Sequence, residues 1–139
     1  MIVDASVGVK WLVPETDCEL ALALLAGQDL AAPDLFRIEV GHTLGKLYRR
    51  GGATLSIVRD AWAELDEMPL LLQPSSGLFT PAFDLSIRLG AAMYDCVYLA
   101  MAEAMDDLLV TADGRFARAV QQAGAPGLAR RVQLLSELR

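Results

Sequence analysis

The chain has 139 residues, of which 54% are hydrophobic and 22% are charged, with a formal net charge of −6 at pH 7. The length fits one domain, predicted over residues 1–139, and the acidic balance argues against a broad basic surface for nucleic acid. A membrane span is not expected, because the apolar runs 20–26 and 96–102 have seven residues each and a spanning helix needs roughly 20. The start of the chain lacks the basic stretch of a secretory signal, so we expect a cytoplasmic protein.

The mean hydropathy of +0.36 is high for a soluble chain of this size. We therefore expect part of the apolar surface to be covered by a partner. The two cysteines, Cys18 and Cys96, are far apart within apolar helical patterns. They are predicted to be buried free thiols, not a disulfide or a thiolate metal site.

The first predicted element is a strand, Met1–Val3, which runs directly into Asp4. A short apolar run with β-branched residues is typical of a strand that is buried on both faces of a parallel sheet. Ligands of open α/β sheets bind outside the carboxyl ends of the strands. Asp4 is therefore a candidate site residue.

Helix signals follow in regular alternation with short apolar runs. Thr16 with Glu19 has the form of a capping box, Asp34 and Thr54 are predicted N-caps, and Thr80 with Pro81 is predicted to open a helix. The predicted helices cover 5–13, 17–26, 34–50, 54–65, 80–89, 94–105 and 115–123, and further strands cover 30–32, 70–72, 108–111 and 132–135, with a turn at 124–127. This alternation predicts an α/β fold, with helices on both faces of a parallel sheet.

Four carboxylates interrupt segments that are otherwise apolar. Asp4 and Asp113 follow predicted strands, and Glu39 and Asp95 lie near the starts of predicted helices. The carboxyl ends of parallel strands, and the helices that follow them, share one edge of a sheet. We therefore expect the four acids to lie close together.

Such a cluster has an electrostatic consequence. Two carboxylates about 5 Å apart repel by roughly 3 kcal/mol at an effective dielectric constant of about 20. The acids must take up protons or surround a divalent cation. Oxygen ligands without thiolate or imidazole favour Mg²⁺ or Mn²⁺ over Zn²⁺. Metal-assisted phosphodiester hydrolysis is the reaction class that this arrangement predicts.

The segments that hold these acids resemble the PIN-domain family, in particular the VapC-type toxins of bacterial toxin–antitoxin pairs. The resemblance covers nearly the whole chain, and its two C-terminal segments are the most specific. It rests on Ile2–Ser6, on Pro33–Leu35 leading to Glu39 and Val40, on Tyr94–Ala102, and on Leu109–Phe116.

The resemblance implies a PIN-like three-layer α/β/α sandwich with a central parallel sheet of four or five strands. It further implies an endoribonuclease that depends on Mg²⁺ or Mn²⁺, forms a homodimer and is inhibited by an antitoxin protein lying along the active-site groove. Carried over by position, the catalytic acids are Asp4, Glu39, Asp95 and Asp113. Asp4 and Asp95 would be the direct metal ligands, Glu39 and Asp113 would act partly through water, and Ser6 and Thr111 would hydrogen-bond the carboxylates or metal-bound water.

Two other interpretations stay open at this point. A PIN-like binding module that binds RNA or a partner without cleavage would suit the negative charge. A phosphoacceptor receiver domain is also an α/β fold with acids at strand ends, but the only lysines, Lys10 and Lys46, do not follow a strand. An acidic chain that cleaves RNA would need local cations, for which Lys10, Arg88 and Arg115 are candidates, with solvated surface as the favoured interpretation of all three.

Overall fold

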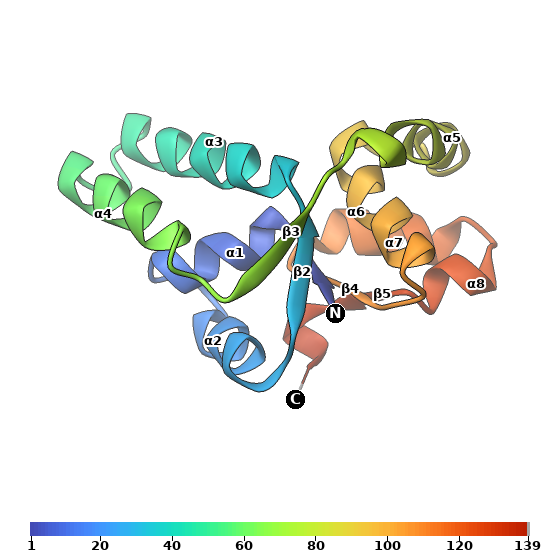
Figure 1. The fold of residues 1–139 in the computed structure, drawn as a ribbon, viewed down its shortest axis with the longest axis horizontal. Coiled ribbons are helices and arrows are strands. Elements are labelled where there is room, and N and C mark those ends of the chain that lie inside the picture. The colour runs from blue at the N-terminus through green and yellow to red at the C-terminus, as the bar shows by residue number, and fades with distance from the viewer. Residues whose placement is uncertain (139) are drawn as a thin grey trace.

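The computed structural model describes residues 1–138, and within them it contains one five-stranded sheet (Figure 1). The strands are β1 (Ile2–Val3), β2 (Leu30–Pro33), β3 (Leu70–Gln73), β4 (Leu109–Thr111) and β5 (Val132–Leu134). Their order is β3-β2-β1-β4-β5, and every neighbouring pair is parallel. In the central strand, Ile2 lies opposite Ala31 of β2 and Leu109 of β4. The predicted α/β fold with a parallel sheet is confirmed.

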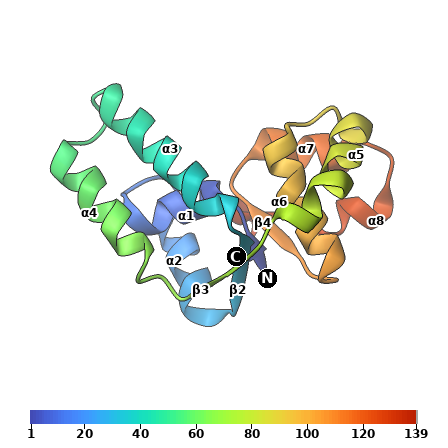
Figure 2. The same cartoon turned by 45° about the horizontal axis from the view of Figure 1, so that its top comes forward.

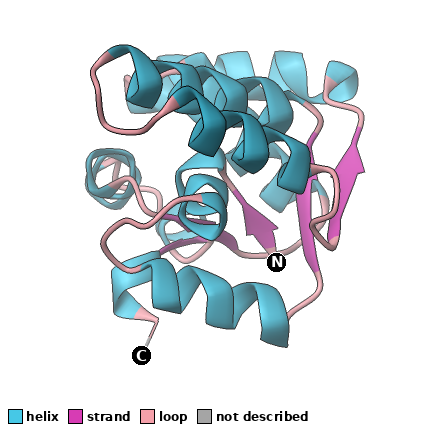
Figure 3. Cartoon of the chain, turned by 90° about the vertical axis from the view of Figure 1, so that its left-hand side faces the viewer, coloured by secondary structure: helices cyan, strands magenta, loops and turns pink. Residues whose placement is uncertain are grey.

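Helices cover both faces of this sheet. They are α1 (Ala5–Leu12), α2 (Cys18–Gly27), α3 (Leu35–Arg49), α4 (Leu55–Leu65), α5 (Phe79–Leu89), α6 (Met93–Ala104), α7 (Gly114–Gln122) and α8 (Pro126–Ala129). Helices α1 to α4 lie on one side and α5 to α8 on the other, and α3 and α4 form a hairpin that extends away from the sheet (Figures 1 and 2). Seen from the side of this hairpin, helices stand in front of the strands (Figure 3). The result is the three-layer arrangement that the sequence predicted.

The hydrophobic core is centred on β1, β4 and α6. Ile2, Val3, Leu109 and Val110 are fully buried, and so is nearly every residue of the run 96–102. A helix that is apolar all round needs cover on all sides, which β1, β2, β4 and α5 provide for α6. Among residues 1–138, no single helix is long and apolar enough to cross a membrane. Only the helix pair 76–89 and 93–104 meets these length and composition requirements when taken together, and it is bent by 115°.

The strand order excludes the receiver-domain interpretation. Doubly wound receiver domains have the order 2-1-3-4-5, in which the third strand lies next to the first. Here β3 lies at the edge beside β2, and β4 is the neighbour of β1. The crevice beside β1 is therefore formed by the ends of β1 and β4.

Two predicted helix caps are wrong. Helix α2 begins at Cys18, with Asp17 at its N-cap in the left-handed conformation and no side-chain cap, so Thr16 and Glu19 form no capping box. The Thr16 carbonyl instead accepts a hydrogen bond from Lys10 Nζ, which pulls the loop back toward α1. Asp34 precedes α3, but its carboxylate accepts hydrogen bonds from the amide and hydroxyl of Ser75 and not from its own helix. Both corrections come from contacts that cannot be read from local spacing.

Other element boundaries differ only at their ends. The Thr54 hydroxyl caps α4 as predicted, accepting a hydrogen bond from the Ile57 amide at 3.3 Å. Helix α5 begins at Phe79, after a 3₁₀ turn over Ser76–Leu78, so Thr80 lies inside the helix and its predicted role as the cap is also wrong. The predicted turn at 124–127 is wrong in part, because Pro126 opens the short helix α8. Proline is well suited to the first turn of a helix.

Candidate active site

The structure brings the four predicted acids to one pocket at the carboxyl edge of the sheet. This acidic pocket has a volume of about 320 Å³ and lies between the starts of α1, α6 and α7 and the first turns of α3. The residues that line it are Asp4, Ala5, Ser6, Val9, Lys10, Glu15, Glu39, Thr43, Asp95, Ala112 and Asp113. Residues 109 positions apart in the chain thus face the same space, as the predicted sheet required.

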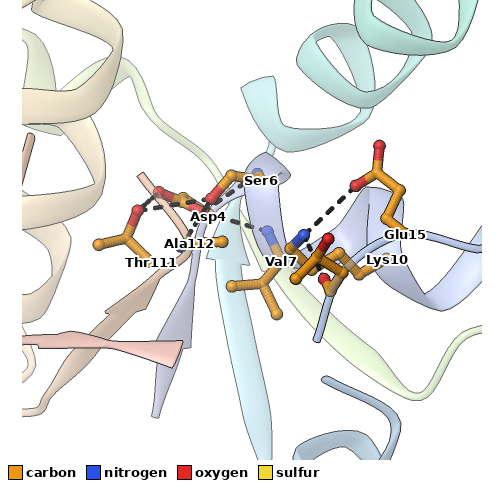
Figure 4. Close-up of polar contacts among 8 residues, drawn as sticks. Asp4, Ser6, Val7, Lys10, Glu15, Thr111 and Ala112 are labelled. Carbon is orange, nitrogen blue, oxygen red and sulfur yellow. Dashed lines mark hydrogen bonds and ion pairs between the residues drawn. The ribbon is translucent and has the colours of Figure 1, made fainter. Parts of the chain in front are cut away.

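Asp4 is buried and held by four donors. It is the N-cap of α1, so its Oδ1 accepts the amide hydrogens of Ser6 at 3.1 Å and Val7 at 3.3 Å. The hydroxyls of Ser6 and Thr111 also donate to this carboxylate (Figure 4). The expected hydrogen bonds from Ser6 and Thr111 to an acid are therefore present. Burial raises the pKa of Asp4, and these hydrogen bonds oppose the rise.

The same hydroxyls connect β1 to β4. Ser6 Oγ accepts the amide hydrogen of Ala112 at 2.9 Å, and Thr111 Oγ1 accepts that of Asp113 at 3.0 Å. Asp113 in turn caps α7, where its Oδ1 accepts the amide hydrogens of Arg115 at 2.9 Å and Phe116 at 3.1 Å. Asp4 and Asp113, which we call the strand-end pair, are thus fixed by helix capping.

A glycine brings the third acid close. Gly8 of α1 packs against Phe36 of α3, and a Cβ at position 8 would lie 2.3 Å from a ring carbon of Phe36. Only glycine leaves room for this approach of the two helices. Because Glu39 is in the turn of α3 that follows Phe36, the close contact places its carboxylate beside Asp4.

Glu39 and Asp95, which we call the helix pair, lack such hydrogen bonds. Glu39 Oε1 is buried without a hydrogen-bond partner, and no hydrogen bond within residues 1–138 contributes to the pKa of Asp95. Burial, followed by the charges of Asp95 and Asp4, raises the pKa of Glu39 to about 7. Burial, followed by the charges of Asp4 and Asp113, raises the pKa of Asp95 to about 6. The helix pair and Asp4 therefore share the electrostatic cost of the site, but only Asp4 has capping amides and hydroxyls that oppose it.

Tyr98 is a residue of this site that the sequence did not single out. It is fully buried on α6, three residues after Asp95 and so on the same helix face. Its hydroxyl is buried without a hydrogen bond of standard geometry, yet it lies close enough to Glu39 for each group to act on the pKa of the other. The signal was the i, i+3 spacing from Asp95, hidden within an apolar run.

The structure separates the three candidate cations. Lys10 lines the pocket, whereas Arg88 and Arg115 are exposed and are not among the residues that line it. Solvated surface is therefore the wrong interpretation for Lys10, whose side chain is only 13% exposed. The pocket has one lysine facing five acids.

The donor set fits a hard divalent cation. Within residues 1–138, no three His, Cys, Asp or Glu side chains already converge as closely as metal ligands do. The pocket nevertheless offers carboxylate and hydroxyl oxygens, an unpaired Glu39 Oε1 and acids of raised pKa, the features that a cation would relieve. Mg²⁺ binds through one or two carboxylates and keeps several waters, so it does not need a closed cage.

Comparison with known proteins agrees with this geometry. Residues 1–121 match the family model of the PIN domain. The chain belongs to the PIN-domain family. This PIN domain is 35% identical to Ribonuclease VapC3 of Mycobacterium tuberculosis, over 91% of the chain and 92% of that relative. It is 32% identical to Ribonuclease VapC3 of Pyrobaculum aerophilum, over 84% of the chain and 92% of that relative. The family resemblance to VapC-type proteins is therefore confirmed.

Solved structures support the same fold. A structure of Mycobacterium tuberculosis VapC20, a sarcin–ricin loop cleaving toxin, aligns with a TM-score of 0.64 and 17% identity over 85% of this PIN domain and 93% of that chain. A toxin–antitoxin complex from Klebsiella pneumoniae aligns with a TM-score of 0.62 and 17% identity over 96% of both chains. At such low identity the likeness concerns the fold, and it confirms the expected PIN-like sandwich.

Proposed function

We propose that this protein is an endoribonuclease that acts as the toxin of a toxin–antitoxin pair and cleaves RNA phosphodiester bonds with Mg²⁺ or Mn²⁺ at the acidic pocket. The observation that carries the proposal is the convergence of Asp4, Glu39, Asp95 and Asp113 in one pocket, where burial and mutual charge raise the pKa values of three of them. The VapC names of relatives that match over most of their length support the choice of RNA as substrate.

The roles that we propose for the acids are those that the family resemblance implies. Asp4 and Asp95 would hold the cation, and Glu39 and Asp113 would act on it partly through water. A bound divalent cation supplies an activated water and neutralises charge on a phosphate oxygen. Ser6 and Thr111 keep the Asp4 carboxylate in one orientation. Glu39 lines the pocket, and its carboxylate would take the proton of the attacking water as general base.

The test is RNA cleavage by the purified protein in Mg²⁺ or Mn²⁺, with and without EDTA. We expect EDTA to stop cleavage and Asp4→Asn or Asp95→Asn to abolish it, while the surface variant Asp60→Asn cleaves like the wild type. Cleavage that survives both EDTA and Asp95→Asn would place the chemistry elsewhere. A stable RNA complex without cleavage would instead favour the PIN-like binding module.

The partners that we propose are an antitoxin and a second copy of the chain, in the cytoplasm. Phe79, Phe83 and Ile87 form an apolar stripe along α5, with exposed fractions of 50%, 55% and 69%. A contiguous exposed stripe of this kind is typical of an interaction surface. We propose that the stripe pairs with the same stripe of a second copy of the chain. The double variant Phe83→Asp with Ile87→Asp would then convert a dimer to a monomer, as measured by light scattering.

A toxin–antitoxin complex among the matching structures supports an antitoxin as the second partner. The two free cysteines suit a reducing compartment such as the cytoplasm.

A further inference from the structure

Lys10 is the only positively charged side chain among the described residues that line the acidic pocket. Five acids share the pocket with it, namely Asp4, Glu15, Glu39, Asp95 and Asp113. The five carboxylates repel a polyanionic substrate that enters this pocket. Only a bound divalent cation and Lys10 would attract it. Lys10 therefore contributes more to the attraction of an anionic substrate than a lysine elsewhere on the surface would.

Its position is set by the loop that follows α1. Pro14 lies just beyond the end of α1, and the chain turns back so that Lys10 Nζ donates to the Thr16 carbonyl at 2.7 Å. Glu15 from the same loop pairs with Nζ at 3.4 Å (Figure 4). The ammonium group is thus anchored at the rim of the pocket and is not mobile in solvent.

The two contacts differ in how easily they can be exchanged. The bond to Thr16 is short, whereas the pair with Glu15 is long and its carboxylate is one-third exposed. A long ion pair whose carboxylate is partly exposed is weak, because solvent screens that carboxylate. An ammonium group has three donors, so it can keep the carbonyl and exchange Glu15 for another anion.

We propose that Lys10 binds a backbone phosphate of the RNA beside the scissile bond, and that Glu15 competes with this phosphate for the ammonium group. The proposal rests on the nuclease function above and assigns a substrate-binding residue to it. Lysine suits this role as a point charge that needs no fixed geometry at the phosphate. In this arrangement Glu15 limits affinity for RNA, because each binding event must displace it.

Three variants separate this role from a loop-tying one. Lys10→Met removes the positive charge of the side chain, and Lys10→Arg keeps it. Glu15→Gln breaks the same ion pair but leaves the lysine in place. The probe is a short fluorescent RNA of mixed sequence, and its affinity is measured by anisotropy in Ca²⁺ in place of Mn²⁺ over a series of salt concentrations, with gel analysis to confirm that the RNA stays intact. Thermal melting of each variant reports whether the loop is still in place.

We expect Lys10→Met to weaken binding about 10-fold and to reduce the slope of log affinity against log salt by about 0.7, the value for one phosphate on a single strand. Lys10→Arg should restore most of the affinity and the slope. Glu15→Gln should tighten binding about 2- to 5-fold and lower KM in cleavage assays, since the competitor is gone.

Opposite signs for Lys10→Met and Glu15→Gln support the proposal. Weaker binding in both variants would assign the pair to loop structure alone, and an unchanged salt slope in Lys10→Met would remove the lysine from the RNA contact. These failures are distinct from a failure of the nuclease function, because wild-type cleavage in Mn²⁺ is measured first. A wild type that cleaves while Lys10→Met keeps its KM and salt slope would overturn the lysine proposal only.

Discussion

The two halves of the acidic pocket differ in how the fold treats a carboxylate. The strand-end pair, Asp4 and Asp113, caps helices α1 and α7, and each carboxylate accepts hydrogen bonds from amides of its own first turn. The helix pair, Glu39 and Asp95, has no such donors, and burial raises the pKa of both. One half of the site is thus part of the scaffold, and the other half is held against its electrostatic preference.

This difference suggests a division of labour. A capped carboxylate is held in one orientation by its hydrogen bonds, so it can define where a cation sits. An uncapped, desolvated carboxylate is stabilised only when a proton or a cation arrives. Carboxylates whose burial raises their pKa and lowers the stability of the fold are often found at functional sites.

Loss of cleavage is the largest expected effect, and it should not distinguish the two halves. Asp95→Asn removes a cation ligand and Glu39→Gln removes the group that takes the proton, so each should lower kcat about 10²–10⁴-fold. Asp4→Asn should do the same. Single-turnover cleavage of RNA in Mn²⁺ measures this, with Asp60→Asn as the matched surface control. A variant of either pair that keeps full activity would contradict a shared site.

In the absence of metal, variants of the strand-end pair should lower the free energy of unfolding, whereas variants of the helix pair should raise it. Asp4→Ala leaves the start of α1 uncapped and the Thr111 and Ser6 hydroxyls without their acceptor, so we expect a loss of about 1–3 kcal/mol in the free energy of unfolding. Glu39→Gln and Asp95→Asn remove repulsion and should raise it by up to about 1 kcal/mol.

Urea unfolding in EDTA at pH 7.5 measures both effects. Thr54→Ala is the control for a simple cap, since Thr54 caps α4 far from the site. It should lose about 1 kcal/mol with unchanged activity. Destabilisation of all the acid variants alike would show that the helix pair is also structural.

The pH dependence of stability follows from the raised pKa values. The pKa rises from an ordinary 4.5 to about 7 for Glu39 and from 3.8 to about 6 for Asp95 on folding. The folded state therefore binds more protons than the unfolded state within these ranges, and the free energy of unfolding falls as pH rises through them. After allowance for solvent screening, we expect a decrease of about 1–2 kcal/mol between pH 5 and pH 7.5 from these two groups.

Double replacement of the helix pair by Gln and Asn tests the source of this slope. The metal-free double variant should lose part of the decrease that the wild type shows, and Asp4, whose pKa burial also raises, should retain the rest. The same slope in both proteins would mean that other groups produce it.

The smallest effect is expected for Tyr98→Phe. The hydroxyl lowers the pKa of Glu39, so its removal should raise that pKa further and shift the acidic limb of the pH–rate profile to higher pH. Stability should change by less than about 1 kcal/mol, because the hydroxyl has no hydrogen bond of standard geometry to lose. A large loss of stability with an unshifted pH profile would make Tyr98 a core residue only.

The convergence of the acids could be predicted because it depends on topology. Asp4 and Asp113 follow strands of a parallel sheet, and Glu39 and Asp95 lie near the starts of helices at the same edge, so strand and helix signals alone place them together. Residue spacing could not predict the difference between the pairs. That difference depends on which amides each carboxylate faces and on how deeply the close contact of Gly8 with Phe36 buries Glu39.

The wrong predictions have a common cause in contacts between distant residues. Thr16 has the pattern of a cap, but Lys10 draws its carbonyl away. Asp34 has the pattern of a cap, but Ser75, 41 residues later, takes its carboxylate. The helical pattern alone favours a solvated surface for Lys10, because nothing in it shows that the loop after Pro14 turns back toward this lysine. Local signals locate elements well, and they fail where a side chain has a stronger partner elsewhere.

Calorimetric titration of the metal-free protein with Mn²⁺ at pH 7.5 tests most directly the central claim that the four acids form a cation site. If the helix pair is held in place for a cation, the wild type binds Mn²⁺, and Asp95→Asn binds it far more weakly. Asp60→Asn should match the wild type. Absence of Mn²⁺ binding, or equal binding in the wild type and Asp95→Asn, would contradict a cation site among these four acids.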